Sequence, residues 1–255
     1  MYPDIVFIVP YRDRIPHKFF FDKYMQHVLE DISSNTYEIY YAEQCDDRPF
    51  NRGAMKNIGF IAMKEKYIDH YHDITFVFND VDCVPYTKNI LDYNTRHGTI
   101  KHFYGFKHLL GGIVSIKGKD FETINGYPNF WTWGYEDNFL NIRALKHNLT
   151  IDRSTFFDMN DSNILHFFHG NKRLHDMSIT TKTKTNSGLN TIKNLKYTIQ
   201  NNMICINNFI SLNDTLSNKN IKNIKNINID GLDYMEEKKH MNKRCKNPAF
   251  HMNFK

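Results

Sequence analysis

The sequence is poor in the features that define several classes of protein. It contains only four cysteines in 255 residues, and no two of them form a Cys-x-x-Cys pair. A zinc knuckle and a disulfide framework are therefore not expected, and reduced thiols are the default expectation, with a single bridge left open. No apolar run approaches the roughly 20 residues that a membrane helix requires, and the N-terminus lacks a signal-peptide pattern. These absences predict a soluble, cytoplasmic protein without a membrane segment.

A strongly basic surface is also missing. The formal net charge is only +5, and no compact block of Lys and Arg with interleaved aromatic residues occurs before the last fifth of the chain. We therefore expect no nucleic-acid partner. A mild excess of positive charge suits an anionic small molecule such as a nucleotide. The length and the hydrophobic content of 41% are those of a globular protein that buries a sizeable core.

Strand-like and helix-like segments alternate along the first third of the chain. In order they are an apolar strand at 5–9 that Pro10 ends, a helix at 18–32, a strand at 37–42, a helix at 51–67 and a strand at 74–78. The first helix has apolar residues at helical spacing, namely Phe19, Phe20, Tyr24, Val28 and Leu29, and in the second we expect Met55, Ile58, Ile61 and Ala62 to face inward. This alternation predicts an α/β fold with a mainly parallel central sheet and helices on both faces. We assign residues 1–207 to a single domain. Residues 208–255, rich in Asn, Lys and Ile, form an extension that we expect to be partly ordered at best.

Two carboxylates follow the strand at 74–78. Asp80 and Asp82 are two residues apart, so their side chains share one face if the strand pattern continues. Carboxylate oxygens are ligands for a hard divalent cation, and enzymes that use nucleotide-sugars need such a cation to neutralise the departing diphosphate. An acidic turn after a core strand also explains the pair. A basic loop at 11–14 follows the first strand, and ligands of parallel sheets bind at the carboxyl ends of the strands.

A second acidic pair lies in the middle of the chain. Glu136 and Asp137 follow a glycine-containing segment that holds both tryptophans, Trp131 and Trp133. A carboxylate there could act as the base that removes a proton from an attacking hydroxyl, and the tryptophans suit sugar stacking and a closing lid. The acidic start of a helix also accounts for the pair, and both roles are compatible.

Two histidines, His166 and His169, are three residues apart in a later apolar run. Neutral imidazoles bind first-row divalent metals. A lone histidine in an apolar run is more often a core residue with satisfied hydrogen bonds. The acidic pair upstream favours metal ligation here.

Taken together, these segments resemble the β-1,4-galactosyltransferase family over roughly residues 4–207. The matching motifs are Pro10–Arg14 for the family's Pro-Phe-Arg-x-Arg loop, Phe50–Gly53 for Phe-Asn-Arg-Ala, Asp80–Asp82 for the metal motif, Gly111–Ser115 and Thr123–Asn129 for two glycine-containing segments, Trp131–Asn138 for Trp-Gly-Trp-Gly-Gly-Glu-Asp-Asp, and Ser187–Asn190 for Asp-Gly-Leu-Asn. Any one of these motifs is modest evidence, but their joint order makes an accident improbable.

The resemblance implies a GT-A fold and an inverting hexosyltransferase. Such an enzyme moves galactose from a UDP-sugar to a hydroxyl of a glycan or glycoconjugate and forms a β-linkage. The resemblance places Mn²⁺ on Asp82, His166 and His169, together with two diphosphate oxygens. Some members carry Met at the position of His166, so an imidazole here should loosen the preference for Mn²⁺ and tolerate Mg²⁺. Asp137 takes the role of catalytic base, and Glu136 binds the acceptor sugar or orients the loop.

The resemblance also assigns residues to the donor. They are Pro10, Arg12, Arg14, Phe50, Arg52, Asp80, Val81, Leu109, Gly112 and Trp133. Guanidinium forks suit phosphate or uridine oxygens, and Phe50 would stack on the uracil. Leu109 stands where the family often has a Tyr that crowds C2 of the sugar, so the donor is either UDP-galactose or UDP-N-acetylgalactosamine. Thr132, Tyr135 and Asn138 depart from the family motif, which leaves the acceptor unidentified.

Two other functions compete with this interpretation. A metal-dependent phosphodiesterase or nuclease could use Asp80, Asp82 and the histidines. It would not explain the segment 131–137, and such nucleases usually carry more acidic ligands around two metals. A catalytically idle sugar-binding module is the other alternative, and the retention of Asp82, Asp137 and both histidines argues against it.

Overall fold

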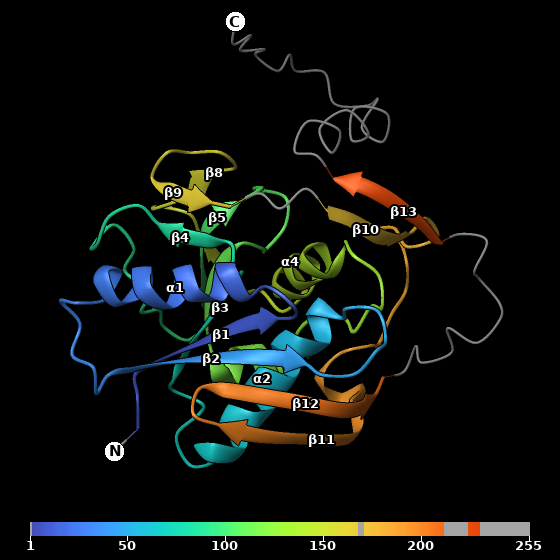
Figure 1. Cartoon of the computed structure of the whole chain (residues 1–255), viewed down its shortest axis with the longest axis horizontal. Helices are drawn as coiled ribbons and strands as arrows, with labels where there is room; N and C mark the ends of the chain where they lie inside the picture. Colours follow the sequence, from blue (N-terminus) through green and yellow to red (C-terminus); the bar gives the residue numbers. More distant parts are fainter. Residues whose placement is uncertain (1, 168–170, 212–223, 230–255) are drawn as a thin grey trace, which may run out of the picture.

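The computed structural model describes residues 2–167, 171–211 and 224–229. Its centre is a nine-stranded sheet with the order β11-β12-β2-β1-β3-β6-β5-β7, in which β8 also pairs with β5. The strands are β1 (Ile5–Tyr11), β2 (Tyr37–Gln44), β3 (Thr75–Asn79), β5 (Thr99–Gly105), β6 (Ile113–Lys117), β7 (Thr150–Asp152), β8 (Phe157–Asp158), β11 (Lys193–Gln200) and β12 (Met203–Ile210). Figure 1 shows β12 and β11 beside β2 at one edge of the sheet.

Most pairings in this sheet are parallel. Five are parallel (β1 with β2, β1 with β3, β12 with β2, β5 with β7 and β5 with β8), and three are antiparallel (β11 with β12, β3 with β6 and β5 with β6). The expectation of a mainly parallel central sheet is therefore confirmed. The first strand is longer than expected, because β1 continues through Pro10 and pairs with β2 as far as Tyr11.

Helices cover both faces of the sheet, which confirms the predicted α/β architecture. They are α1 (Ile15–Val28), α2 (Arg52–Lys66), α3 (Gly118–Thr123) and α4 (Glu136–Lys146), with a short 3₁₀ turn, η1 (Leu189–Thr191). Alternate residues of a strand point to opposite faces, so Val6 and Ile8 join the core under α2 and α4, whereas Phe7 and Val9 join the core under α1. Figure 1 shows α1 and α2 on opposite faces.

The two long helices differ in how well the sequence predicts their inward faces. In α2, Asn51 caps the first turn by accepting a hydrogen bond from the backbone N–H of Ala54, and a long buried stretch packs on the sheet. In α1 the outcome is mixed: Val28 and Leu29 are buried as expected, but Phe19 is 66% exposed. Phe21 and Met25, which the spacing did not predict, also face the core.

The arrangement gathers three loops at one edge of the sheet. The carboxyl ends of the parallel strands β1, β2 and β3 lie at this edge. A small sheet of β4 (Cys83–Pro85) and β9 (Ile164–His166) adds a second layer there and sets His166 opposite Cys83. The edge therefore collects residues that are far apart in the sequence, which is the usual way in which such sheets form a binding site.

The C-terminal part of the chain contributes strands to the central sheet and to a separate two-stranded sheet. The predicted domain boundary at 207 falls inside β12, and a further strand, β13 (Ile224–Ile229), pairs antiparallel with β10 (Asn171–Asp176). The remainder of the predicted extension lies outside the described residues, so the division into 1–207 and 208–255 stays a prediction. Among the helices that the structure describes, none has the length and apolar character needed to cross a membrane.

Candidate active site

The acidic motif after β3 lies in a turn. β3 ends at Asn79, whose side-chain amide donates to the carbonyls of Asp80 and Cys83 at 2.8 Å and holds the turn to β4. The strand pattern does not continue through the motif, so the expectation that Asp80 and Asp82 share a face through strand alternation is wrong. The two carboxylates instead bind different cations, Arg52 and Arg14.

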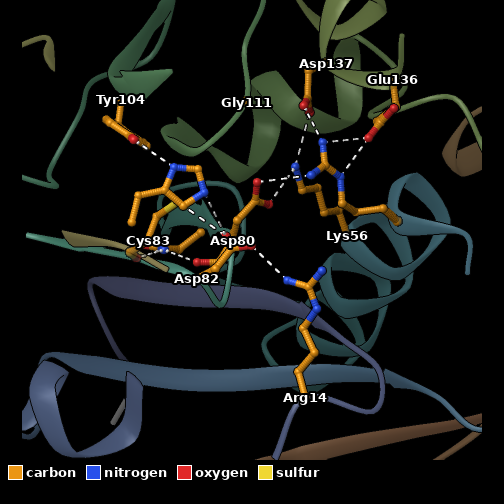
Figure 2. Close-up of polar contacts among 12 residues, drawn as sticks. Arg14, Lys56, Asp80, Asp82, Cys83, Tyr104, Gly111, Glu136 and Asp137 are labelled. Atoms are coloured by element: carbon orange, nitrogen blue, oxygen red, sulfur yellow. Dashed lines mark hydrogen bonds and ion pairs between the residues drawn. The ribbon is translucent and has the colours of Figure 1, made fainter. Parts of the chain in front are cut away.

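The first group of side chains, which we call the base cluster, joins α2 to the start of α4 (Figure 2). It consists of Arg52, Lys56, Asp80, Glu136 and Asp137. Arg52 donates to all three carboxylates: to Glu136 Oε1 at 2.7 Å, to Asp137 Oδ2 at 2.6 Å and to Asp80 Oδ2 at 3.2 Å. Because one guanidinium binds three carboxylates, it fixes the acidic pair of α4 against the turn after β3.

Lys56 is the second cation of the base cluster. Its Nζ lies 3.2 Å from Asp137 Oδ1 and 3.5 Å from Asp80 Oδ1, and its side chain is 1% exposed. The sequence analysis missed this residue. Lys56 follows Arg52 by one helical turn, so both occupy one face of α2, but a single lysine within a helix carried no further signal.

The pKa values of Asp137 and Asp80 are shifted in opposite directions. Burial raises the pKa of Asp137 to about 6, although Lys56 and Arg52 act against this rise. Burial would also raise the pKa of Asp80, but the charges of Arg52 and Lys56 outweigh it and hold that pKa below its ordinary value. Asp80 is therefore a fixed anion, whereas Asp137 can exchange a proton near neutral pH, as a general base must.

The backbone around Asp137 restricts the position of this residue. Tyr135, which precedes α4, has φ of 67°, a left-handed conformation that is strained for a side chain of this kind. The N–H of Leu110 donates to the carbonyl of Asp137 at 3.0 Å. A Cβ at Gly111 would lie 2.4 Å from Asp137 Oδ2, so only glycine lets the loop approach this carboxylate.

The second group, which we call the metal cluster, lies on the other side of Asp80. It consists of Arg14, Asp82, Cys83, Tyr104 and His166. Arg14 Nη1 donates to Asp82 Oδ2 at 2.8 Å, and His166 Nε2 lies 3.9 Å from Asp82 Oδ1. His166 Nδ1 lies 2.9 Å from the hydroxyl of Tyr104. This contact orients the ring so that Nε2 faces Asp82, which is the arrangement typical of histidines that bind metals.

The donor atoms of this cluster fit a divalent cation. A carboxylate oxygen of Asp82, the sulfur of Cys83 and a ring nitrogen of His166 all lie within 4.8 Å of one another. Burial lowers the pKa of His166, which favours the neutral imidazole that ligation requires. The carboxylate and the imidazole suit a first-row metal such as Mn²⁺. The third predicted ligand, His169, lies outside the described residues. Cys83, whose thiol donates to Asp82 Oδ1 at 3.4 Å, was not predicted.

The remaining predicted donor residues are more dispersed. Pro10 and Val81 are buried beside the two clusters, and Phe50 packs half-buried on the core. Arg12 does not join Arg14 and Arg52: its guanidinium donates to the carbonyl of Arg48 in the loop before α2.

The segment from Leu109 to Gly112 lies next to Asp137. Leu109 is buried, and its Cδ1 would lie 3.2 Å from a Cβ at Gly111. Gly112 has φ of +71°, and a Cβ there would lie 2.4 Å from the carbonyl oxygen of Tyr104, so this position also requires glycine. The loop before α4 is held from the other side, because the N–H of Trp133 donates to the carbonyl of Leu174 in β10 at 2.7 Å.

Family models match the two parts of the chain that build both clusters. A model described as the N-terminal region of glycosyl transferase group 7 matches residues 2–94, and one described as the N-terminal domain of galactosyltransferase matches residues 97–170. The chain belongs to the β-1,4-galactosyltransferase family. The resemblance inferred from the ordered motifs is thereby confirmed.

Curated members of the family are similar over much of this chain. Xylosylprotein 4-beta-galactosyltransferase of Caenorhabditis elegans is 29% identical over 184 residues, which are 69% of this chain and 62% of that protein. Beta-1,4-galactosyltransferase 1 of Homo sapiens is 31% identical over 162 residues, 58% of this chain and 38% of that protein. The chain thus spans less than two thirds of the length of these relatives.

Solved structures of a family member share the fold. The catalytic domain of Drosophila beta1,4-galactosyltransferase 7 in complex with xylobiose matches with a TM-score of 0.65 and 21% identity, over 84% of this chain and 97% of that chain. A mutant of the same protein, in complex with manganese, UDP-Gal and xylobiose, matches over the same shares with a TM-score of 0.61 and 20% identity. At this identity the likeness shows the fold, which is the GT-A architecture expected from the sequence.

Proposed function

We propose that this family member is an inverting, metal-dependent galactosyltransferase that moves a hexose from a UDP-sugar to a hydroxyl of a sugar acceptor and forms a β-linkage. One observation carries the proposal. Asp137 is a buried carboxylate whose pKa is raised to about 6, and its cations Arg52 and Lys56 also bind Asp80, which shares a turn with Asp82 of the metal cluster. A base and a metal site on two sides of one turn are what a single displacement at the anomeric carbon requires.

Each cluster has its own task in this reaction. Asp82, His166 and, outside the described residues, His169 would hold a divalent cation, which would supply the positive charge that neutralises the departing diphosphate. Mn²⁺ is the proposed ion, since the Drosophila relative binds manganese with UDP-Gal, and Mg²⁺ is expected to substitute for it. Asp137 accepts the proton of the acceptor hydroxyl as that oxygen attacks, and Glu136 keeps the acceptor oriented.

The donor sugar depends on Leu109. We propose that UDP-N-acetylgalactosamine is used at a rate comparable to UDP-galactose, because Leu109 is a branched aliphatic side chain without a phenol ring. Leu109→Tyr should shift the preference toward UDP-galactose by filling the space that the acetamido group needs. Competition between the two donors measures this shift, with Leu109→Met as the control that keeps the position apolar and flexible. An unchanged donor ratio in Leu109→Tyr would refute the role of Leu109.

The acceptor is proposed to be a glycan or glycoconjugate. The Drosophila relative was solved with xylobiose. In this chain Thr132, Tyr135 and Asn138 line the start of α4 next to Glu136 and Asp137. A sugar with its hydroxyl toward Asp137 fits the proposed chemistry, and a panel of oligosaccharides is the direct way to identify it.

Hydrolysis of UDP-sugars with Mn²⁺ tests the function without a known acceptor, because water replaces the acceptor hydroxyl. A galactosyltransferase releases UDP and the free sugar as the β-anomer, which ¹H NMR distinguishes from the α-anomer. A phosphodiesterase would release UMP instead, and an idle binding module would release nothing. Chelation should abolish the reaction and added Mn²⁺ should restore it, and Asp82→Ala should stay inactive. Turnover that survives chelation, or release of UMP, would overturn the proposal.

A further inference from the structure

Lys56 is a charged residue in a position where the packing needs none. It lies in the buried stretch of α2, with Met55 and Asn57 on either side, and its side chain is 1% exposed. Its Nζ lies 4.6 Å from the centre of the Tyr127 ring, a further contact that favours a cation. Burying a lysine costs several kcal/mol unless anionic partners offset the loss of water. The residue is therefore expected to have a function that an apolar side chain would not supply.

The contacts of Lys56 are also not needed to pair the carboxylates. Arg52 already binds Asp80, Glu136 and Asp137. Lys56 approaches the other oxygen of Asp137, Oδ1, while Arg52 binds Oδ2. Two cations on the two oxygens of one carboxylate fix the plane of that carboxylate. Figure 2 shows the side chain of Lys56 directed at Asp137.

We propose that Lys56 is a positioning residue for the transfer reaction: its ammonium group holds Asp137 as a correctly oriented carboxylate that can accept the proton of the acceptor hydroxyl. The proposal rests on the galactosyltransferase function proposed above. Lys56 does not contact the substrate in this role, since it acts through Asp137.

The sign of the effect follows from the charges around Asp137. The groups that face it are Arg52 and Lys56 from α2, Asp80 from the turn after β3, and Glu136 from its own helix. Burial and the two carboxylates raise its pKa, and the two cations lower it. Removing Lys56 leaves one cation, so the pKa of Asp137 rises further. A base works only when deprotonated, so the activity of a variant without Lys56 should be lost at a higher pH than in the wild type.

The pH dependence of kcat for UDP-sugar hydrolysis tests this in Lys56→Met and Lys56→Gln. The wild type should lose activity as the pH falls through about 6, the pKa of Asp137. In both variants this acid limb should move up by about 1–3 pH units, the range that an opposite charge at this distance produces. At pH 7 a shift of about 1–3 pH units corresponds to a fall in kcat of about 2–100-fold, while KM for the donor should change less than about twofold. Lys56→Arg, which keeps a charge, should retain most of the wild-type profile.

A matched control lies on the same helix. Lys64 forms an ion pair with Glu122 away from both clusters, so Lys64→Met removes a paired lysine of α2 and should leave the pH profile unchanged. If Lys64→Met and Lys56→Met gave the same profile as the wild type, Lys56 would be a structural residue and the proposal would be wrong.

A second measurement does not depend on activity. The ¹³C-carboxyl resonance of Asp137, assigned by its absence in Asp137→Asn, can be titrated in wild type and in Lys56→Met. We expect a higher pKa in Lys56→Met, and an unchanged titration would overturn the proposal. If the wild type hydrolyses no UDP-sugar, the proposed function fails, and with it the positioning role of Lys56 in transfer, even where the resonance shifts.

A double variant provides the test if the single variants at Lys56 do not fold. Should Lys56→Met and Lys56→Gln fail to fold, the double variant Lys56→Met/Asp137→Asn removes both partners of the ion pair. Restored folding in the double variant would support a charge interaction specific to Asp137. A double variant that stays unfolded would show that Lys56 serves the packing of α2 and would overturn the proposal.

Discussion

The base cluster and the metal cluster both include an aspartate of the turn after β3, but they differ in the source of the positive charge that faces their carboxylates. In the base cluster two cations, the partly exposed Arg52 and the buried Lys56, already bind three carboxylates. In the metal cluster Asp82 has one fixed cation, Arg14, and its other neighbour His166 is an imidazole whose pKa is lowered by burial. The first cluster therefore takes its cations from the chain itself, whereas the second offers a carboxylate and an imidazole to a cation that must come from solution. This difference predicts that their substitutions damage different steps.

The largest effect is expected for Asp137→Asn. A positioned general base contributes about 10²–10⁴-fold, and the amide cannot accept the proton, so kcat for transfer should fall by that factor. Binding of UDP with Mn²⁺, measured by calorimetry, should stay near the wild-type value because the metal cluster is untouched. Asp92→Asn is the control, since Asp92 pairs with Lys101 in an exposed position. A loss of UDP binding in Asp137→Asn would mean that the two clusters do not have separate tasks.

Tyr104→Phe is expected to have an intermediate effect, and this effect should be on metal binding and not on the chemical step. Removing the hydroxyl next to His166 Nδ1 should weaken Mn²⁺ binding about 10–100-fold, as changes in the partners of metal ligands usually do, with kcat restored at saturating Mn²⁺. The dependence of rate on Mn²⁺ concentration gives both values.

Tyr93→Phe is the matched control for Tyr104→Phe. Tyr93 is another buried tyrosine of the same core, and its hydroxyl has no hydrogen-bond partner among the described residues. The two variants should differ in apparent Mn²⁺ affinity. Equal affinities would remove Tyr104 from the metal cluster.

The smallest effect is expected on stability, at Tyr135, the left-handed residue that precedes α4. At the left-handed Tyr135, a residue with a Cβ carries about 1 kcal/mol of strain that glycine avoids. Tyr135→Gly should therefore be more stable to denaturant than Tyr135→Ala by about that amount. In the interior of α1 the order should reverse, so that Tyr24→Ala is more stable than Tyr24→Gly. The same order at both positions would show that Tyr135 stores no strain.

The sequence predicted the large features and the elements of the sheet, because apolar runs of the right length leave few alternatives. The α/β class, the parallel pairing around β1 and the meeting of the 11–14 loop with the acidic turn all follow from such runs. The predicted end of β1 was wrong. A proline is tolerated near the end of a strand where its missing N–H faces no partner, so Pro10 did not end β1.

The details of the site depended on tertiary contacts that spacing does not encode. Asp80 and Asp82 were expected to share a face, but the chain turns after Asn79 and separates their partners. Lys56, Tyr104 and Cys83 were missed because nothing in the sequence around them forms a recognisable motif for a base or a metal site. Only the distances to Asp137, His166 and Asp82 distinguish them.

The position of β12 has a consequence for how the protein is made. Residues 203–206 pair in parallel with residues 41–44, so the edge of β2 is covered only by a segment that is translated about 160 residues later. At roughly 5–20 residues per second, a nascent chain waits on the order of 8–30 s for that segment. During this time the exposed backbone of β2 can pair with other chains. Yield of soluble protein should therefore depend on chaperones and on the rate of translation more than on the stability of the finished sheet.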